Sequence, residues 1–225
     1  MTRHFEQLLG DLRATLLRMG SLVDEQVELG VKALVTSDLA LAQHVMERDR
    51  KVDEFDNRID QLCVSILATT QPVAMDLRLL MASLKINGEL ERIGDIAVNL
   101  AERAKPLQPH QEFVRRAGIE EMALAARAMV KDAIDAFVNN DASLARHVLE
   151  SDDRVDSLDA AMFNRMIAEM RESPATIDPA AHIMMISRHV ERLADHATNI
   201  AEDVIFLVKA KVIKHHAGDE QSLTG

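Results

Sequence analysis

The chain has 225 residues, a formal net charge of −11 and a single cysteine, Cys63. The negative charge disfavours direct binding to nucleic acid, because the phosphate backbone would repel it. The N-terminal residues lack the pattern expected of a signal peptide, and no apolar run reaches the roughly 20 residues that a membrane helix needs. We therefore expect a cytoplasmic protein that is not inserted in a membrane, with Cys63 buried as a small hydrophobe rather than joined in a disulfide.

Apolar residues make up 48% of the chain, whereas Gly and Pro number only eight and five, which predicts long helices around an aliphatic core. The first helix is expected over residues 5–34, where apolar residues recur at steps of three and four. Asp38 supplies N-cap chemistry for a second helix, which ends before Pro72 because proline cannot continue a helix interior. A third helix is expected over residues 73–104, and the two-proline stretch at 105–109 is interpreted as a linker.

The second half of the chain repeats this plan. Asp141 and Asp178 are its expected N-caps, with Pro179 at the first position of the last helix. Because the connections are short, helices of about 30 residues must pack as antiparallel neighbours. The predicted fold class is all-α, a tandem repeat of two antiparallel three-helix bundles with six long helices. The expected elements are helices over residues 111–139, 142–172 and 179–214, repeat units over residues 1–106 and 107–214, and a disordered tail over residues 215–225.

The chain is a tandem duplication of a unit of roughly 100 residues. Residues 91–102 and 191–202 match at seven of twelve positions, in the pattern E-R-x-x-D-x-x-x-N-x-A-E. Residues 33–56 and 136–159 match at twelve of 24 positions and share the pattern D-x-x-V-D-x-x-D. Both patterns place acidic residues at the spacing of a helix turn, so the duplication raises the question of why these acids are retained.

The retained acids predict a metal site in each unit. On a helix, Glu91, Asp95 and Asn99 form one axial stripe of oxygen-bearing side chains, and Asp49 and Asp53 form another. Like charges at i, i+4 destabilise a helix by a few tenths of a kcal/mol, which favours a neutralising cation. Oxygen-rich sites suit hard or borderline divalent metals. The candidate ligands are Asp49, Asp53, Glu91, Asp95, Asn99, Asp152, Asp156, Glu191, Asp195 and Asn199.

The competing interpretation is that these acids form the solvated face of amphipathic helices. Such a face needs no particular residue. Positions interpreted as exposed elsewhere have diverged between the copies, as at Glu89 with His189 and Asn87 with Ser187, whereas the stripe is retained. The contrast favours a specific role for the stripe.

Several basic residues could serve the same surface. The duplicated Arg92 and Arg192 could pair with the acids, which is the commoner role, or meet a phosphate. His44 and His147 recur, but they are expected in the core or at its boundary rather than as ligands. His196 has no histidine counterpart in the first unit, so any contribution from it is limited to the second.

These motifs, together with the segment Met75-Asp76-Leu77-Arg78, closely resemble the PhoU family of phosphate-specific transport system accessory proteins, over about residues 3–214. The resemblance implies a cytoplasmic bacterial regulator of two three-helix bundles, usually a homodimer. It implies negative regulation of the phosphate-starvation response, with two partners, the ATPase subunit of the phosphate ABC transporter and the phosphate-sensing histidine kinase. It also implies possible clusters of iron, zinc or another divalent metal, held by the acids of the E/D-x-x-x-D motifs and the two asparagines.

Two classes of function remain. The first is a non-enzymatic signalling adaptor. The alternative is a metal-dependent enzyme, a phosphohydrolase or an oxidase, built on a carboxylate cluster. A catalytic site also needs a shielded pocket and a general acid or base, whereas these stripes are expected on an open helix face. The adaptor is therefore the favoured interpretation.

Overall fold

The computed structural model describes residues 2–210, which form all six of the predicted long helices. No β-strand occurs in this range, so the predicted all-α class is confirmed. The helices are α1 Thr2–Thr36, α2 Leu39–Thr69, α3 Ala74–Glu102, α6 Ile119–Asn139, α7 Ala142–Glu172 and α8 Ile177–Lys209, joined by α4 Ala104–Leu107, η1 Gln108–His110, α5 Gln111–Ala117 and η2 Pro174–Thr176. The predicted tail at 215–225 lies outside the described residues. No helix within residues 2–210 is long and apolar enough to cross a bilayer.

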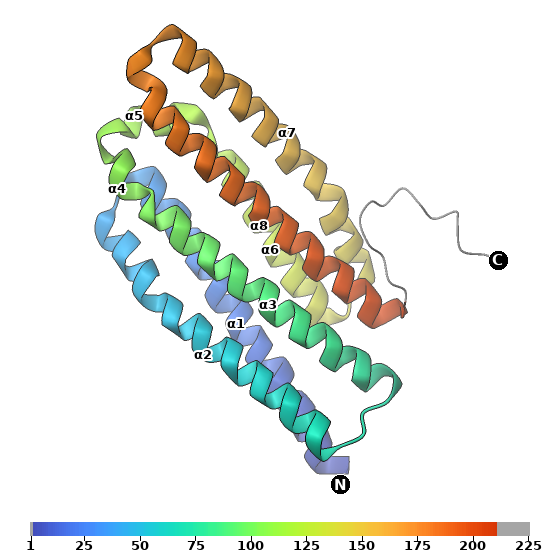
Figure 1. The fold of residues 1–225 in the computed structure, drawn as a ribbon. Coiled ribbons are helices and arrows are strands. Elements are labelled where there is room, and N and C mark those ends of the chain that lie inside the picture. The colour runs from blue at the N-terminus through green and yellow to red at the C-terminus, as the bar shows by residue number, and fades with distance from the viewer. Residues whose placement is uncertain (1, 211–225) are drawn as a thin grey trace, which may run out of the picture.

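The helices form two layers (Figure 1). Helices α2, α3, α8 and α7 lie side by side in that order, and α1 and α6 lie behind them. Helix α1 packs on α2 and α3, α6 packs on α7 and α8, and α1 also contacts α6. We call the line of contact between α3 and α8 the seam. It is antiparallel, because Lys85 pairs with Asp203 near one end and Arg103 lies beside His182 near the other.

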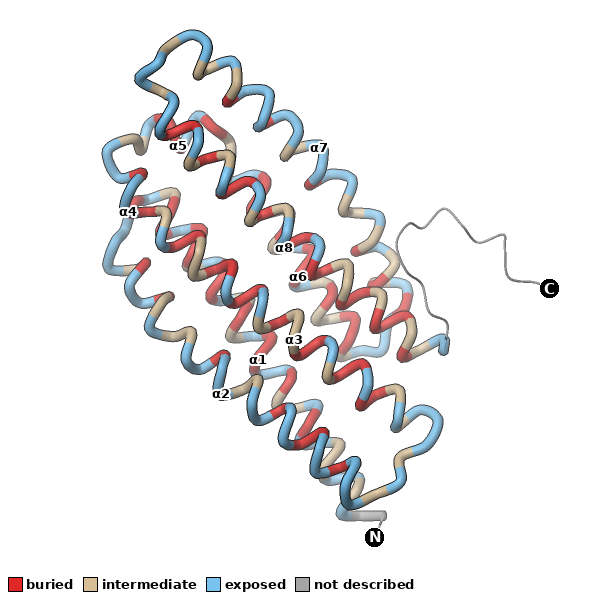
Figure 2. Tube along the Cα trace, in the orientation of Figure 1, coloured by how far each residue is buried: buried red, intermediate tan, exposed pale blue. Residues whose placement is uncertain are grey.

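One aliphatic core runs through both units (Figure 2). Cys63 belongs to it, and burial raises the pKa of its thiol to about 11, which confirms the predicted buried cysteine. On α3 and α8 the buried faces carry small residues, which let helices approach closely. These are Gly94, Ala97 and Ala101 on α3 and their counterparts Ala194, Ala197 and Ala201 on α8.

The predicted caps at the start of the second helix in each unit are confirmed. Asp38 accepts a hydrogen bond from the Leu41 amide at 2.9 Å, and Asp141 accepts one from the Leu144 amide at 3.0 Å. Each carboxylate thereby satisfies a backbone N–H that the first helical turn leaves without a partner.

The predicted helix over residues 111–139 is wrong in one respect, because Gly118 divides it into α5 and α6. This glycine has a φ of 81°, in the left-handed region that glycine adopts without a steric penalty. Arg165 on α7 donates to the carbonyls of Arg116 and Ala117, at 3.1 and 2.8 Å. It thereby satisfies carbonyls that the end of α5 leaves free.

Three further boundaries differ from the prediction. The stretch at 105–109, interpreted as a linker, falls in the short turns α4 and η1, and Pro106 lies in a first turn that needs no N–H donor. Asp178 is not the cap of α8, which begins at Ile177 after Thr176. Helix α8 ends at Lys209, and residues 211–214 of its predicted extension lie outside the described residues.

The close contact between α1 and α3 makes a prediction about Gly30. A methyl group at this position would lie 2.7 Å from the carbonyl oxygen of Ala97, so Gly30→Ala should destabilise the protein by about 1–3 kcal/mol. Gly10→Ala is the control, because no atom lies within 4 Å of its added methyl group. The control should be neutral or stabilising by up to about 1 kcal/mol, as expected for alanine in a helix. Urea denaturation of both variants is the measurement, and equal free energies of unfolding would contradict the contact.

Candidate functional site

In the first unit, the acids of α2 and α3 lie close enough to raise one another's pKa. Burial raises the pKa of Asp49, and the charges of Asp53 and Asp95 add to the effect. Burial likewise raises the pKa of Glu91, followed by the charges of Asp95 and Asp56. The acids of the two helices, Asp49, Asp53, Asp56, Glu91 and Asp95, are therefore brought near one another where α2 packs on α3, and we call this cluster the first acidic groove.

The second unit repeats this arrangement on α7 and α8, in the second acidic groove. Burial raises the pKa of Asp152 to about 6, with further contributions from Asp156 and Asp195. Burial and the neighbouring Asp195 raise the pKa of Glu191 as well. In both grooves the outermost acids are exposed, namely Asp53, Asp95, Asp156 and Asp195.

The two grooves differ in how their charge is neutralised. In the second, Arg188 lies 3.1 Å from Glu191 and 3.8 Å from Asp159. The corresponding position in the first unit is Gly88, which has no side chain to do this. Even so, Oε2 of Glu191 is buried without a hydrogen-bond partner, so part of the second groove's acceptor capacity is unused.

The donor chemistry of both grooves fits a divalent cation. Carboxylate oxygens are hard ligands, and an unpaired buried acceptor such as Glu191 Oε2 would gain from a bound cation. As the side chains lie, no three of the His, Cys, Asp and Glu residues in the described range converge closely enough to hold an ion. The grooves thus have suitable ligands, which would have to converge on a bound ion.

The predicted ligand Asn199 is directed elsewhere. Its amide donates to Oε2 of Glu89 at 3.1 Å, across the seam. Its counterpart Asn99 is half-buried at the equivalent place on α3. Asn199 therefore contributes to the contact between the units, and this contact could not be predicted from its place in the acidic stripe.

Two pairs of diverged positions were wrongly interpreted as exposed. Asn87 and Ser187 are buried, at 1% and 3% exposure. Asn87 donates to the Asp56 carboxylate at 2.7 Å, and Ser187 donates to the Asp159 carboxylate. An uncharged side chain thus donates to an equivalent aspartate in each groove, an amide in the first and a hydroxyl in the second. The two copies differ here in the kind of hydrogen-bond donor, and the position is not a solvent-exposed one that is free to vary.

Glu89, at the second diverged pair, is the centre of a polar cluster on the seam. Its side chain is only 13% exposed and contacts His196 Nδ1 at 2.7 Å and Arg92 at 2.9 Å. These contacts and the amide of Asn199 lower its pKa against the opposing effect of burial. A cleft of about 420 Å³ lies beside the cluster and includes the ion pair of Lys85 with Asp203. The sequence signal for this cluster was the replacement of Glu89 by a histidine in the second copy.

The recurring histidines His44 and His147 are both exposed, so their predicted place in the core or at its boundary is wrong. His196 is buried as a partner of Glu89 on the seam. Its ring nitrogen therefore serves the contact between α3 and α8.

The model that defines the PhoU domain matches the chain twice, at residues 16–104 and 119–204. The chain belongs to the PhoU family. The phosphate-specific transport system accessory protein PhoU homolog of Pseudomonas aeruginosa is 39% identical over 216 residues, covering 96% of this chain and 89% of the relative. The PhoU accessory protein of Serratia marcescens is 34% identical over 215 residues, covering 96% and 88%.

Two solved PhoU structures share this fold. The crystal structure of PhoU from Pseudomonas aeruginosa superposes with a TM-score of 0.86 at 39% identity, over 92% of this chain and all of that one. The phosphate transport system regulatory protein PhoU from Streptococcus pneumoniae gives the same TM-score at 25% identity, over 94% of this chain. Within residues 2–210, six long helices in two repeated bundles are therefore the architecture of this PhoU-family chain.

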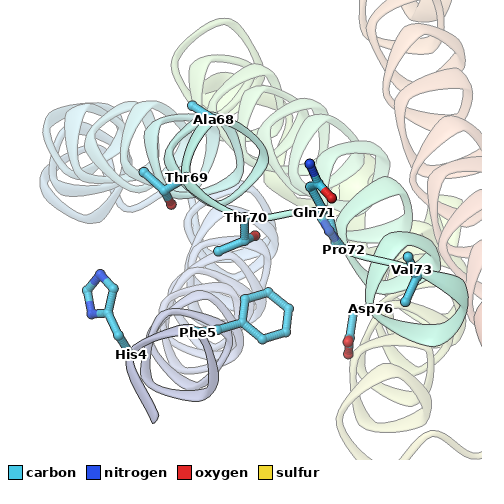
Figure 3. Close-up of a pocket in the computed structure, with 9 residues that line it drawn as sticks. All are labelled: His4, Phe5, Ala68, Thr69, Thr70, Gln71, Pro72, Val73 and Asp76. Carbon is cyan, nitrogen blue, oxygen red and sulfur yellow. The ribbon is translucent and has the colours of Figure 1, made fainter. Parts of the chain in front are cut away.

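The segment Met75–Arg78 of this PhoU-family chain lies at the start of α3. Arg78 donates to the carbonyl oxygen of Leu207 at 3.3 Å, near the end of α8, where carbonyls lack helical partners. Asp76 lines a cavity of about 680 Å³ at the turn between α2 and α3 (Figure 3). Asp56, on the first acidic groove, is about 20 Å from this turn along α2, at about 1.5 Å per residue. The remaining lining residues are His4, Phe5, Ala68, Thr69, Thr70, Gln71, Pro72 and Val73.

The raised pKa of Asp152 makes a prediction about pH in metal-free protein. The folded chain holds this proton up to a pKa of about 6, whereas the ordinary value is 3.8, so stability should fall as pH rises across that interval. Asp152→Asn removes the charge and should be more stable than the parent at neutral pH by about 1 kcal/mol, because solvent screens a half-exposed group. The two proteins should be nearly equal below the ordinary value. Urea denaturation in chelator at both pH values is the measurement, and a difference independent of pH would contradict the coupling.

Proposed function

We propose that this PhoU-family chain is a cytoplasmic regulator of phosphate uptake and of phosphate-starvation signalling. It links the ATPase subunit of a phosphate ABC transporter to a phosphate-sensing histidine kinase, and it represses the starvation response when phosphate is plentiful. The observation that carries the proposal is the naming of its relatives. Proteins that match 96% of this chain are accessory proteins of the phosphate-specific transport system, and a structural relative is a phosphate transport system regulatory protein.

The placement of the acids favours an adaptor over an enzyme. A catalytic carboxylate cluster needs shielding from water and a positioned acid or base. Here Asp95 and Asp195 are exposed, and the cavity of about 680 Å³ lies at a helix turn away from both grooves. An open acidic groove suits docking of a basic surface or binding of a cation.

We further propose that each acidic groove binds a divalent metal, such as iron or zinc. The ligands in the first groove are Asp49, Asp53, Glu91 and Asp95, and those in the second are Asp152, Asp156, Glu191 and Asp195. Asn99 lies next along the first stripe and could complete it, whereas Asn199 would have to leave Glu89 to do so. A bound cation would supply positive charge to crowded carboxylates and join two helices that pack against each other.

A homodimer is the assembly that we propose for signalling. Exposed apolar residues gather toward the turn between α2 and α3, a composition that favours association with another protein surface. They are Val64, Leu67, Val73, Met75, Leu77 and Met81. Sedimentation velocity over a hundredfold range of concentration tests the dimer, and a monomer throughout would contradict it.

The regulatory role predicts the phenotype of a deletion. Removing the gene should derepress a phosphate-starvation reporter in medium with ample phosphate, because the repressing link to the sensor kinase is lost. The measurement is reporter activity in the parent, in the deletion strain and in a strain complemented with the full chain. Normal repression in a strain without any second copy of the gene would contradict the proposal.

The metal proposal predicts that the effect of a double substitution on protein stability changes sign when metal is bound. Glu191→Gln with Asp195→Asn should be neutral or slightly stabilising in chelator, because like-charge repulsion at i, i+4 disappears. In the metal-loaded protein the same pair should destabilise, because bound metal stabilises the parent by about 2.7 kcal/mol at a hundred times its dissociation constant. Thermal unfolding with chelator, Zn²⁺, Mn²⁺ or Fe²⁺ is the measurement, and the same pair of changes at Glu91 and Asp95 tests the first groove.

If the double mutant differs from the parent in stability by the same amount in chelator and in excess metal, the metal proposal is contradicted. The acids would then serve as a docking surface for a basic partner. The rival enzyme class is tested separately, by turnover of generic phosphoesters with added metal. Sustained metal-dependent hydrolysis that is lost in Asp95→Ala would support the phosphohydrolase and contradict the adaptor.

A further inference from the structure

The end of the seam opposite the Glu89 cluster is basic. Arg103, at the end of α3, places Nη1 3.5 Å from Nδ1 of His182 on α8. His189 and Arg192 follow on α8, and the positive charges of Arg103 and Arg192 both act on His189. Arg103 and three basic residues of one stretch of α8 therefore lie at this end of the seam, on a chain whose net charge is −11.

The internal repeat explains how this basic end arose. The residues equivalent to Glu89 and Asp203, which supply the negative charge at the other end, are His189 and Arg103. Arg92 is therefore neutralised by Glu89 three residues before it, whereas Arg192 has a histidine in that position. At both equivalent positions an acid in one half of the seam corresponds to a base in the other.

No carboxylate within residues 2–210 is within ion-pairing distance of Arg103 or Arg192. Arg103, His182 and His189 are all half-buried, and Nδ1 of His189 is buried without a hydrogen-bond partner. Burial and the two arginines also lower the pKa of His189, which fits a local positive field with nothing to balance it. Positive groups held together away from full solvation are unfavourable unless a negative group joins them.

We propose that Arg103, His182, His189 and Arg192 form a binding site for free inorganic phosphate. The two guanidinium groups present rigid N–H forks that match the oxygens of a tetrahedral anion. His182 accepts from Arg103 through Nδ1, which leaves its Nε2–H as a further donor. Nδ1 of His189, which is buried without a hydrogen-bond partner, is available to donate to the anion as well.

This site lies on the seam, outside both acidic grooves, and it does not depend on the proposed regulatory partners. Phosphate binding at the seam and repression of a reporter can each be present without the other. The failure of one proposal is therefore distinguishable from the failure of the other.

The test is isothermal titration of chelator-treated full-length protein with inorganic phosphate at constant ionic strength. We expect saturable binding of one phosphate per chain. Arg103→Lys keeps the charge but removes the fork, and Arg192→Gln removes a charge, so each should weaken binding at least tenfold. His189→Glu introduces the acid found at the equivalent position of the first unit and should abolish binding by neutralising Arg192.

The matched control is Arg92→Gln, which removes the equivalent arginine of the first unit, already paired with Glu89. Its affinity for phosphate should stay within twofold of the parent. Circular dichroism and thermal unfolding of every variant separate lost binding from lost folding, and Arg192→Gln, an exposed position, is the variant least coupled to folding.

Absence of saturable binding up to 10 mM phosphate, on the order of the weakest specific affinities, would overturn the proposal. So would an equal loss in Arg92→Gln, or equal binding of chloride, which would show only general attraction to positive charge. Phosphoserine is the last arm of the experiment. Tighter binding of this monoester than of phosphate would overturn free phosphate as the ligand and assign the site to a phosphorylated partner.

Discussion

The close packing of α3 against its neighbours is the constraint on which the rest of the structure depends. Gly30 on α1 lies so near the Ala97 carbonyl that a single methyl group would not fit, and Ala97 and Ala197 are fully buried. Small residues on the inner face of the duplicated motif hold the helix axes close together. The acidic residues on the outer face of the same helices are thereby brought near the acids of α2 and α7. The same twelve-residue pattern therefore determines both the close packing of the helices and the position of the acids.

Crowded carboxylates need partners, and the molecule supplies them differently in its two halves. Asn87 serves Asp56 in the first unit, and Ser187 serves Asp159 in the second. The second groove also has Arg188, whereas glycine occupies that place in the first. In both grooves, burial first and neighbouring carboxylates second still raise the pKa of an aspartate, Asp49 in one and Asp152 in the other. The first groove thus has one internal partner fewer than the second.

Helical periodicity was sufficient to predict six helices, because each buries a continuous apolar stripe. Periodicity could not locate the break at Gly118, because one glycine inside an apolar pattern is compatible with an unbroken helix. The break depends on Arg165, a residue of another helix, which donates to a carbonyl that the end of α5 leaves free. The acidic stripes could be predicted from spacing alone, because spacing determines the face within one helix. The burial of Glu89 could not, because it follows from the contact of α3 with α8, helices about 100 residues apart.

Two identical subunits related by a two-fold axis must present the same residues at both ends of their contact. This chain joins its two units covalently. Glu89 and Asp203 lie at one end of the seam, and the equivalent positions at the other end are occupied by His189 and Arg103. The seam therefore has an electric dipole along its length, which a symmetric pair of single units could not have. A charged helix laid along this face would be held in one direction rather than in either, so duplication within one chain gives the surface a polarity.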